Sequence, residues 1–486
     1  MPIEIKVVSA RSGIRNAYTR MPFRFGVITM RAAPLLTLAA EIEDGRGRRA
    51  TGYAADFLAF RWFDKRPDKS LADNCADLLR AVDAARDLYL DAGEEGLTTP
   101  FELWRATYPE IERRALGFGF NRLGAAFGSS MLERAVIDGV GRLTGRTFFA
   151  LVQGGDLGVE LGAISPELQG RALREFLPER PLAHLHVRHT VGLVDPITAA
   201  DIAEPVADGL PETLEDYLEV DGISWLKVKV GGALDEDLAR LTAIAGVLER
   251  RARRFGITLD GNEQYRDLDG FVALIEAIKA APALERLWRQ LLFIEQPLDC
   301  GVAMDPGIAP ALSALCRDKP VIIDEADDRV SAFKDAVALG YRGASHKNCK
   351  GIYKSLHNLA LAAVHNARLG RAELFLSAED LSNLPVVPLQ ADLASVALLG
   401  ISHVERNGHH YFRGLGHLSE AEKRQALTAN PDLYERRGDE VFLRITDGTL
   451  ACASLQVPGM GFAAPPDMAA MTPVEAWEFA SLGQAG

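Results

Sequence analysis

The sequence has few cysteines and no long apolar run. Its five cysteines are scattered and never spaced as CxxC, which argues against a disulfide framework or a structural zinc site and favours a reducing compartment. No uninterrupted apolar stretch reaches the roughly 18 residues that a membrane span needs. The first residues also lack the apolar centre of a signal peptide. Together these absences predict a cytoplasmic protein with no membrane partner.

Positive charge is also scarce. The chain carries 54 Lys and Arg against 67 Asp and Glu, a net charge of −13, so a nucleic-acid partner is not expected. Its glycine clusters do not have the spacing of a phosphate-binding loop. Apolar residues, in contrast, make up 48% of the chain, which is enough for a sizeable buried core.

Residues 1–150 contain strand-like patterns followed by helical ones. A predicted hairpin turns at Asp44-Gly45-Arg46-Gly47, because Asp-Gly and Gly-rich pairs favour tight turns. Helical patterns cover residues 70–92 and 127–145. An α+β domain is therefore predicted.

From residue 183 to residue 415 the sequence pattern changes to short apolar runs, each followed by a helical pattern. A β/α unit needs about 30 residues, and eight such units make a (β/α)8 barrel. The sequence thus predicts an α/β fold, a modified (β/α)8 TIM barrel. The last part, residues 416–486, contains one strand pair and is expected to pack back on the first domain and complete it. The eight runs are residues 184–193, 224–230, 256–262, 291–298, 320–327, 343–349, 372–380 and 401–407.

Charged residues end several of these apolar runs. Lys227 and Lys229 lie two apart, so both side chains point to the same face of a strand. The carboxyl ends of barrel strands meet at one rim, where active sites lie. In each of the next four runs the apolar residues lead to a charged residue, 23 to 35 residues after the previous one, and these are Asp260, Glu295, Asp324 and Lys347.

Three converging carboxylates repel one another unless a cation lies among them, and oxygen ligands favour Mg2+. A metal held in this way can bind a substrate carboxylate and stabilise the charge that appears when the α-proton leaves. Lys229 and Lys347 would then approach from opposite sides as acid and base, with Lys227 assisting. A lysine acts as a base only if its pKa is lowered, which a nearby cation would achieve. Lys350 competes with Lys347 for this role.

The sequence resembles the enolase superfamily, in particular its muconate lactonizing enzyme-like branch. The resemblance rests on Lys227-Val228-Lys229, Asp260-Gly261-Asn262, the FIEQPL motif at residues 293–298, the pair Asp324-Glu325, and Lys347. It implies a capping N-terminal domain, Asp260, Glu295 and Asp324 as Mg2+ ligands, and the lysine pair as acid and base.

The same resemblance implies that a mobile loop of the N-terminal domain, residues 22–30, contacts the substrate. The seventh run has no histidine of the mandelate racemase type, and the usual glycine pair after the second lysine is replaced by Gly351-Ile352. The candidate substrate-contact residues are Arg20, Arg24, Asn262, Glu325, Glu379, Asp380, His403 and Glu405.

The sequence therefore predicts a Mg2+-dependent isomerase or lyase that forms a metal-stabilised enediolate from a small carboxylate. Racemisation or epimerisation, cycloisomerisation and elimination of water all remain open. Two alternatives are a Schiff-base lysine lyase on the same barrel and a catalytically decayed barrel that acts as a binding module. A homo-oligomer is expected.

Overall fold

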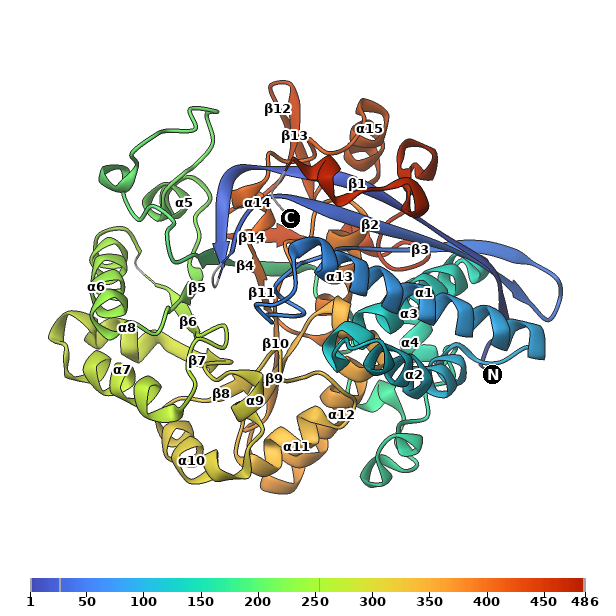
Figure 1. The fold of residues 1–486 in the computed structure, drawn as a ribbon, viewed down its shortest axis with the longest axis horizontal. Coiled ribbons are helices and arrows are strands. Elements are labelled where there is room, and N and C mark those ends of the chain that lie inside the picture. The colour runs from blue at the N-terminus through green and yellow to red at the C-terminus, as the bar shows by residue number, and fades with distance from the viewer. Residues whose placement is uncertain (1, 26–27, 253, 484–486) are drawn as a thin grey trace.

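The computed structural model describes residues 2–25, 28–252 and 254–483, and two sheets organise it (Figure 1). The first is antiparallel and has the strand order β15-β1-β2-β3. One of its two edge strands, β15, comes from the C-terminal part of the chain and pairs with Gly13 and Ile14 of β1. The strands are β1 (Ile5–Phe25), β2 (Ile28–Asp44), β3 (Arg49–Phe57) and β15 (Thr472–Pro473).

The predicted hairpin lies between β2 and β3. The Asp44 Oδ1 atom accepts hydrogen bonds from the backbone N–H groups of Arg46 and Arg48, both at 2.9 Å. Gly47 has a φ of 74°, a backbone conformation that glycine adopts without steric cost.

Helices cover one face of this sheet, and α3 packs closest to it (Figure 1). A Cβ atom on Gly52 of β3 would lie 2.0 Å from the carbonyl oxygen of Ala135, so only glycine permits this approach. The N-caps are Ser70, Thr99 and Asn121, whose side chains accept backbone N–H bonds and begin the helices. The helices are α1 (Leu71–Glu95), α2 (Pro100–Gly117), α3 (Arg122–Thr144) and α4 (Phe148–Gly154).

The second sheet contains eight parallel strands in the order β10-β9-β8-β7-β6-β5-β4-β11. Each strand falls within one of the eight predicted runs. Their apolar residues are buried, as expected for a parallel sheet covered on both faces. The strands are β4 (His184–Val191), β5 (Trp225–Lys229), β6 (Gly256–Asp260), β7 (Leu291–Glu295), β8 (Val321–Ile323), β9 (Gly343–His346), β10 (Phe375–Ala378) and β11 (His403–Arg406).

The sheet is curled, and its edge strands β10 and β11 meet through side chains. The backbone N–H of Asp380 donates to Glu405 at 3.0 Å, and the backbone N–H of Asn407 donates to Asp380 at 3.0 Å. Within the described residues no backbone ladder joins the two strands, so the sheet is a curled half-barrel rather than a demonstrated closed barrel.

Helices follow one another around the outside of the curled sheet (Figure 1). The larger ones are α6 (Leu234–Arg251), α7 (Leu268–Ala280), α10 (Ala309–Asp318), α11 (Ala332–Leu339), α12 (Ile352–Leu369) and α13 (Val387–Leu399). Shorter ones are α5 (Leu214–Val220), α8 (Glu285–Gln290), α9 (Cys300–Ala303) and α14 (Gly408–Tyr411).

The chain after α14 forms α15 (Glu420–Ala429), the hairpin of β12 (Tyr434–Arg437) and β13 (Glu440–Leu443), and β14 (Thr449–Ala451). The last of these strands adds antiparallel to β4. Among the described residues, no helix is long and apolar enough to cross a membrane.

Candidate active site

Lys227 lies at the centre of a buried acidic cluster inside the curled sheet. Its side chain points inward from β5 because the strand alternates its side chains between two faces. Burial opposes the ammonium form, but the surrounding carboxylates outweigh it and raise the pKa of Lys227 well above its usual value. The Nζ atom lies 2.9 Å from Asp260, 2.7 Å from Glu295, and 2.9 Å from each of Glu379 and Glu405.

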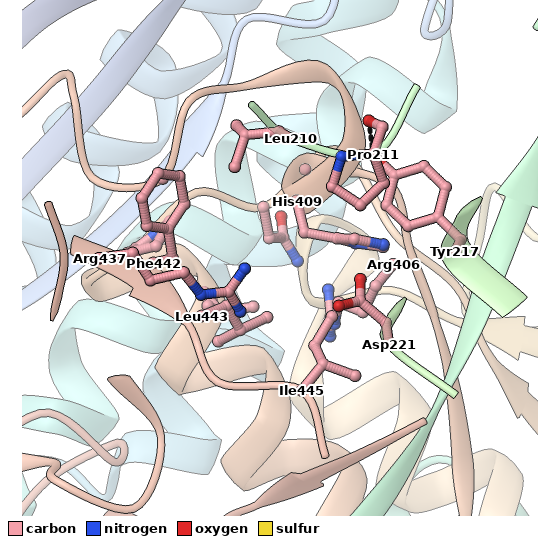
Figure 2. Close-up of a pocket in the computed structure, with 15 residues that line it drawn as sticks. Leu210, Pro211, Tyr217, Asp221, Arg406, His409, Arg437, Phe442, Leu443 and Ile445 are labelled. Carbon is pink, nitrogen blue, oxygen red and sulfur yellow. Dashed lines mark hydrogen bonds between the residues drawn. The ribbon is translucent and has the colours of Figure 1, made fainter. Parts of the chain in front are cut away.

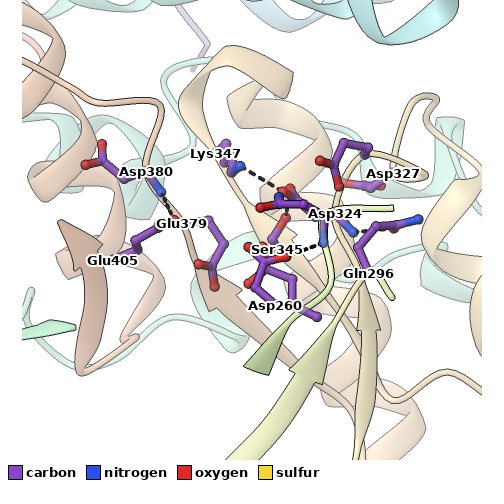
Figure 3. A network of polar contacts seen from close by, with 12 residues as sticks. Asp260, Gln296, Asp324, Asp327, Ser345, Lys347, Glu379, Asp380 and Glu405 are labelled. Carbon is purple, nitrogen blue, oxygen red and sulfur yellow. Dashed lines mark hydrogen bonds and ion pairs between the residues drawn. The ribbon is translucent and has the colours of Figure 1, made fainter. Parts of the chain in front are cut away.

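Lys229 and Lys347 are each held by a carboxylate at the end of a strand. Lys347 Nζ lies 2.7 Å from Asp324 Oδ2 (Figure 3). Lys229 Nζ lies 2.5 Å from Asp260 Oδ2. Three strands separate β5, which ends at Lys229, from β9, which precedes Lys347. The two ammonium groups therefore approach the interior from opposite sides.

Asp324, like Asp260, has two lysine neighbours within ion-pair distance. Its Oδ1 atom accepts from Ser345 and from Lys350, the latter at 3.2 Å. Burial favours the neutral acid, yet Lys347 and Lys350 hold the pKa of Asp324 well below its usual value. In return, Asp324 outweighs the effect of burial and raises the pKa of Lys347. The contact with Asp324 therefore favours the ammonium form of Lys347 for as long as the contact is kept.

The carboxylates fit a hard divalent cation in chemistry and in charge. Asp260, Glu295 and Asp324 offer only oxygen donors, the ligands that Mg2+ prefers. The Glu295 Oε2 atom is buried without a hydrogen-bond partner among the described residues. Burial and the nearby Asp260 and Glu379 raise the pKa of Glu295 well above its usual value, which an added cation would reverse.

The described part of the chain nevertheless holds no three His, Cys, Asp or Glu side chains already arranged as metal ligands. Lysine ammonium groups lie among the carboxylates instead, with Lys227 and Lys229 on Asp260 and Lys347 on Asp324. Binding of Mg2+ by these residues requires some of the lysine–carboxylate contacts to open.

A cavity that is open to solvent on one side lies directly above the lysine pair. Its floor is polar and comes from the curled sheet, while its opposite wall is apolar and comes from the N-terminal sheet and the segment after β3. The floor consists of Lys229, Asn262, Lys347, Asp380, Ser382, Glu405 and Asn407, and the wall includes Phe23, Met30, Phe57, Ala59, Phe60 and Trp62. Leu381, which follows β10, adds an apolar residue on the side of the curled sheet.

The structure brings most of the predicted substrate-contact residues to this region. Asn262, Asp380 and Glu405 line the cavity. Glu379 lies below them, where it accepts from Lys227 at 2.9 Å and pairs with Arg188. Glu325 is buried beside the rim and accepts from a lysine of the N-terminal domain, Lys65, at 3.0 Å.

Three predicted contact residues lie elsewhere. Arg20 forms a paired contact with Asp208 at 2.6 and 2.7 Å and does not line the cavity. Arg24 is exposed. His403 lies at the other end of the strand from the cavity, stacked on Trp225 with ring centroids 4.4 Å apart. Two residues of the predicted mobile loop, 26 and 27, lie outside the described residues.

Three residues at the site were not singled out from the sequence. Trp62 covers Lys347, with Nζ 4.2 Å from the ring centroid. Lys65 reaches Glu325 at the rim of the curled sheet from the same segment. Both depend on how the two sheets pack, so no local pattern reveals them. Arg188 is different, because a lone arginine inside the apolar run of residues 184–193 signals a buried charge that needs a partner.

A second cavity lies between α5, α14 and the β12–β13 hairpin (Figure 2). Tyr217, Asp221, Arg406 and His409 supply its polar groups. Burial raises the pKa of Asp221 to about 6. None of the candidate catalytic lysines or metal ligands lines this cavity, so the chemistry predicted from the sequence belongs to the first one.

The curled parallel sheet beneath an antiparallel sheet is also the fold of solved mandelate racemase/muconate lactonizing enzyme structures. No protein-family model and no curated protein matches the chain. Solved structures do match it, and they confirm the mixed α/β fold with a curled sheet of eight parallel strands and an N-terminal antiparallel sheet.

One similar structure is a mandelate racemase/muconate lactonizing protein from Herpetosiphon aurantiacus, with 17% identity, coverage of 96% of this chain and 100% of that one, and a TM-score of 0.60. Another is an enolase from Bradyrhizobium complexed with magnesium and mandelic acid, with 16% identity, coverage of 98% and 100%, and a TM-score of 0.59. A third is muconate lactonizing enzyme from Pseudomonas fluorescens complexed with muconolactone, with 17% identity, coverage of 96% and 98%, and a TM-score of 0.58. At these identities the likeness establishes the shared fold.

Proposed function

We propose that the protein is a Mg2+-dependent isomerase or lyase that removes the α-proton of a carboxylic acid. The observation that carries the proposal is that Lys229 and Lys347 line one cavity from opposite sides, each held by a carboxylate at a strand end. A pair of amines facing each other across a bound acid can take a proton on one side and return it on the other.

The residues have separate roles in this proposal. Asp260, Glu295 and Asp324 would hold Mg2+, which supplies positive charge beside the substrate carboxylate as the α-proton leaves. Lys229 and Lys347, on opposite sides of the cavity, would act as the acid and base pair. Magnesium in a similar solved structure supports this choice of metal.

Lys227 would orient the site without exchanging protons. It is only 1% exposed, does not line the cavity, and contacts four carboxylates that come from four different strand ends. This arrangement fixes the carboxylates relative to one another.

The steps after proton removal are racemisation or epimerisation, cycloisomerisation, or elimination of water, and a two-lysine site is compatible with all three. We favour elimination or epimerisation.

The strand order further supports a modified (β/α)8 barrel that closes between β10 and β11. In this proposal residues 1–150 are the cap, residues 183–415 the barrel, and residues 416–486 return to the cap. A cytoplasmic homo-oligomer also remains a proposal.

The test is exchange of the α-proton with solvent, followed by NMR in D2O over a panel of carboxylic acids with Mg2+ present. We expect at least one acid to exchange, EDTA to abolish the exchange, and Lys347→Ala to slow it by about 10²- to 10⁴-fold. Lys334→Ala is the matched control, because Lys334 is half exposed and pairs only with Glu167 in the described structure.

Full exchange in Lys347→Ala, full exchange after EDTA, or no exchange of any acid would overturn the proposal. Trapping of a substrate adduct by borohydride would instead establish the Schiff-base alternative.

A further inference from the structure

The second cavity, between α5, α14 and the β12–β13 hairpin, has no part in the proposed function (Figure 2). None of its described lining residues also lines the cavity above the lysine pair. One side of it is the β12–β13 hairpin, which supplies none of the proposed catalytic residues or metal ligands. The two cavities are nevertheless neighbours, because Arg406 of the second donates to Asp380 of the first at 2.9 Å.

Asp221 brings an unpaired carboxylate to the second cavity. It is the residue that follows α5, where its backbone N–H donates to the carbonyl of Tyr217 and its carbonyl accepts from the N–H of Gly448, at 3.2 and 2.7 Å. Asp221 is only 7% exposed. Among the described residues, no hydrogen bond or ion pair reaches its carboxylate. Figure 2 shows this carboxylate directed inward among the lining side chains.

The carboxyl group of Asp221 is largely ionised at neutral pH although its burial is unfavourable. Burial raises its pKa to about 6, which is still below pH 7. A carboxylate that has left water without gaining a partner costs free energy, and a cation bound beside it would offset that cost. The cavity therefore favours a ligand that carries positive charge.

The arginines of the described lining already have carboxylate partners. Arg406 is bound to Asp380, and Arg437 donates to Glu435 at 2.7 Å. Arg437 favours the ionised form of Asp221 from a distance without forming an ion pair with it. An anionic ligand would therefore meet no unpaired cation in this lining and would be repelled by Asp221.

Apolar and aromatic side chains form most of the remaining lining. Tyr217 and Phe442 lie on opposite sides of the group of residues in Figure 2, and aromatic rings attract cations as well as apolar groups. Several apolar residues of the lining are only half-buried, so their surface is open to a ligand: Leu210, Pro211, Phe442, Leu443 and Ile445. Covering such surface with an apolar group is favourable.

We propose that the second cavity binds a small organic cation, an amine with an apolar body. Its ammonium group pairs with Asp221, and its body covers the apolar side chains of the hairpin and of the segment before α5. We call this the amine site. Its occupant is not a substrate of the proposed reaction, because the amine site and the lysine pair share no lining residue.

The test compares probes that share one body and differ in charge. Calorimetric titration near pH 8, where Asp221 is ionised, would use 2-phenylethylamine, neutral 2-phenylethanol, anionic 3-phenylpropanoate, and methylamine, which lacks the body. We expect 2-phenylethylamine to bind with a dissociation constant below about 1 mM. The other three probes should bind about tenfold or more weakly, because each lacks either the charge-assisted hydrogen bond or the apolar contact.

Variants locate the binding in the amine site. Asp221→Asn should weaken binding of 2-phenylethylamine about tenfold or more and leave 2-phenylethanol within about twofold, because only the amine uses the charge. Ile445→Ala should weaken both probes about threefold through lost apolar contact. Asp439→Asn is the matched control, since Asp439 is exposed on the same hairpin and lines neither cavity.

Folding of the variants is checked by their melting temperatures. Asp221→Asn removes an unpaired buried charge, so without a ligand it should melt no lower than the unaltered protein. The comparison of the four probes on the unaltered protein needs no variant.

Three results would overturn the amine site. The first is 2-phenylethylamine binding no more tightly than 2-phenylethanol or 3-phenylpropanoate, or not at all. The second is an affinity that neither Asp221→Asn nor Ile445→Ala changes. The third is an equal loss in Asp439→Asn, which would show attraction to the surface charge alone. None of these results bears on α-proton exchange, so the proposed function stands or falls separately.

Discussion

Among single residues, Glu133 illustrates the cost of a carboxyl group in the core. It lies in α3 and is 1% exposed, and its Oε1 atom accepts a hydrogen bond from the backbone N–H of Tyr353 at 2.6 Å. Its other oxygen is buried without a partner among the described residues. Burial raises the pKa of Glu133 to about 7. The folded protein therefore binds a proton here that the unfolded chain has already released above a pH of about 4.5.

This raised pKa predicts a loss of stability as the pH rises from about 4.5 to 7, since the folded state holds the extra proton only in that window and must carry the buried charge above it. Glu133→Gln keeps the acceptor and removes the charge. The variant should gain about 2–3 kcal/mol relative to the unaltered protein between pH 5 and pH 8. Urea unfolding at both pH values measures this, with exposed Glu95→Gln as control. If the difference in free energy of unfolding between Glu133→Gln and the unaltered protein were the same at both pH values, the raised pKa of Glu133 would be contradicted.

The candidate site could be predicted from the sequence where it depends on strand periodicity. Lys227 and Lys229 share a face because side chains alternate along a strand, and Asp260, Glu295 and Asp324 end successive runs. The pairing of those acids with lysines could not be predicted, because it depends on side-chain positions across several strands.

Within the elements, Arg20 ties the end of β1 to the loop before α5. Its guanidinium donates to Asp208 and to the backbone carbonyls of Pro211 and His410, at 3.1 and 3.0 Å. The side chain is only 3% exposed. Removing a buried cation leaves these acceptors without partners, which is more costly than breaking an exposed ion pair.

Arg20→Met should therefore lower the free energy of unfolding by about 2–4 kcal/mol and speed proteolysis of residues 199–213, while affinity for small acids stays unchanged. Arg24→Met, an exposed arginine on the same strand, should change stability by less than about 0.5 kcal/mol. Chemical denaturation and limited proteolysis measure both effects. If Arg20→Met weakened binding of acids without loss of stability, Arg20 would be a substrate contact after all.

The strands of the curled sheet were predictable because each is a short apolar run followed by a helical pattern. The contact between β10 and β11 could not be predicted, because hydrogen bonds to the side chains of Asp380 and Glu405 make it and a backbone ladder does not. The antiparallel pairing of β14 with β4 could not be predicted from the sequence either, because a three-residue strand leaves almost no periodic signal.

In the whole molecule, the segment around Met460 and Phe462 packs into the N-terminal domain. The backbone N–H of Met460 donates to Asp138 of α3 at 2.8 Å, and Arg142 donates to the carbonyl of Phe462 at 2.7 Å. Both Met460 and Phe462 are fully buried. The end of the chain is thus part of the core of the N-terminal domain.

Ending the chain after Gln456 should therefore cost more than about 3 kcal/mol, because it empties the space of two buried side chains and leaves Asp138 short of a donor. Ending it after Asp467 keeps Met460 and Phe462 and removes β15, so the loss should be smaller. Thermal unfolding of the two shortened proteins measures this order. Equal stability of the shorter protein and the full chain would show that the segment is not part of the core.

The pairing of β1 with β15 has a consequence for synthesis. A ribosome releases the strands and helices of the N-terminal domain long before it makes residues 457–473. During that interval the outer edge of β1 has no neighbour and Asp138 awaits its backbone donor, so the nascent domain presents an open strand edge of the kind that chaperones bind and that invites aggregation.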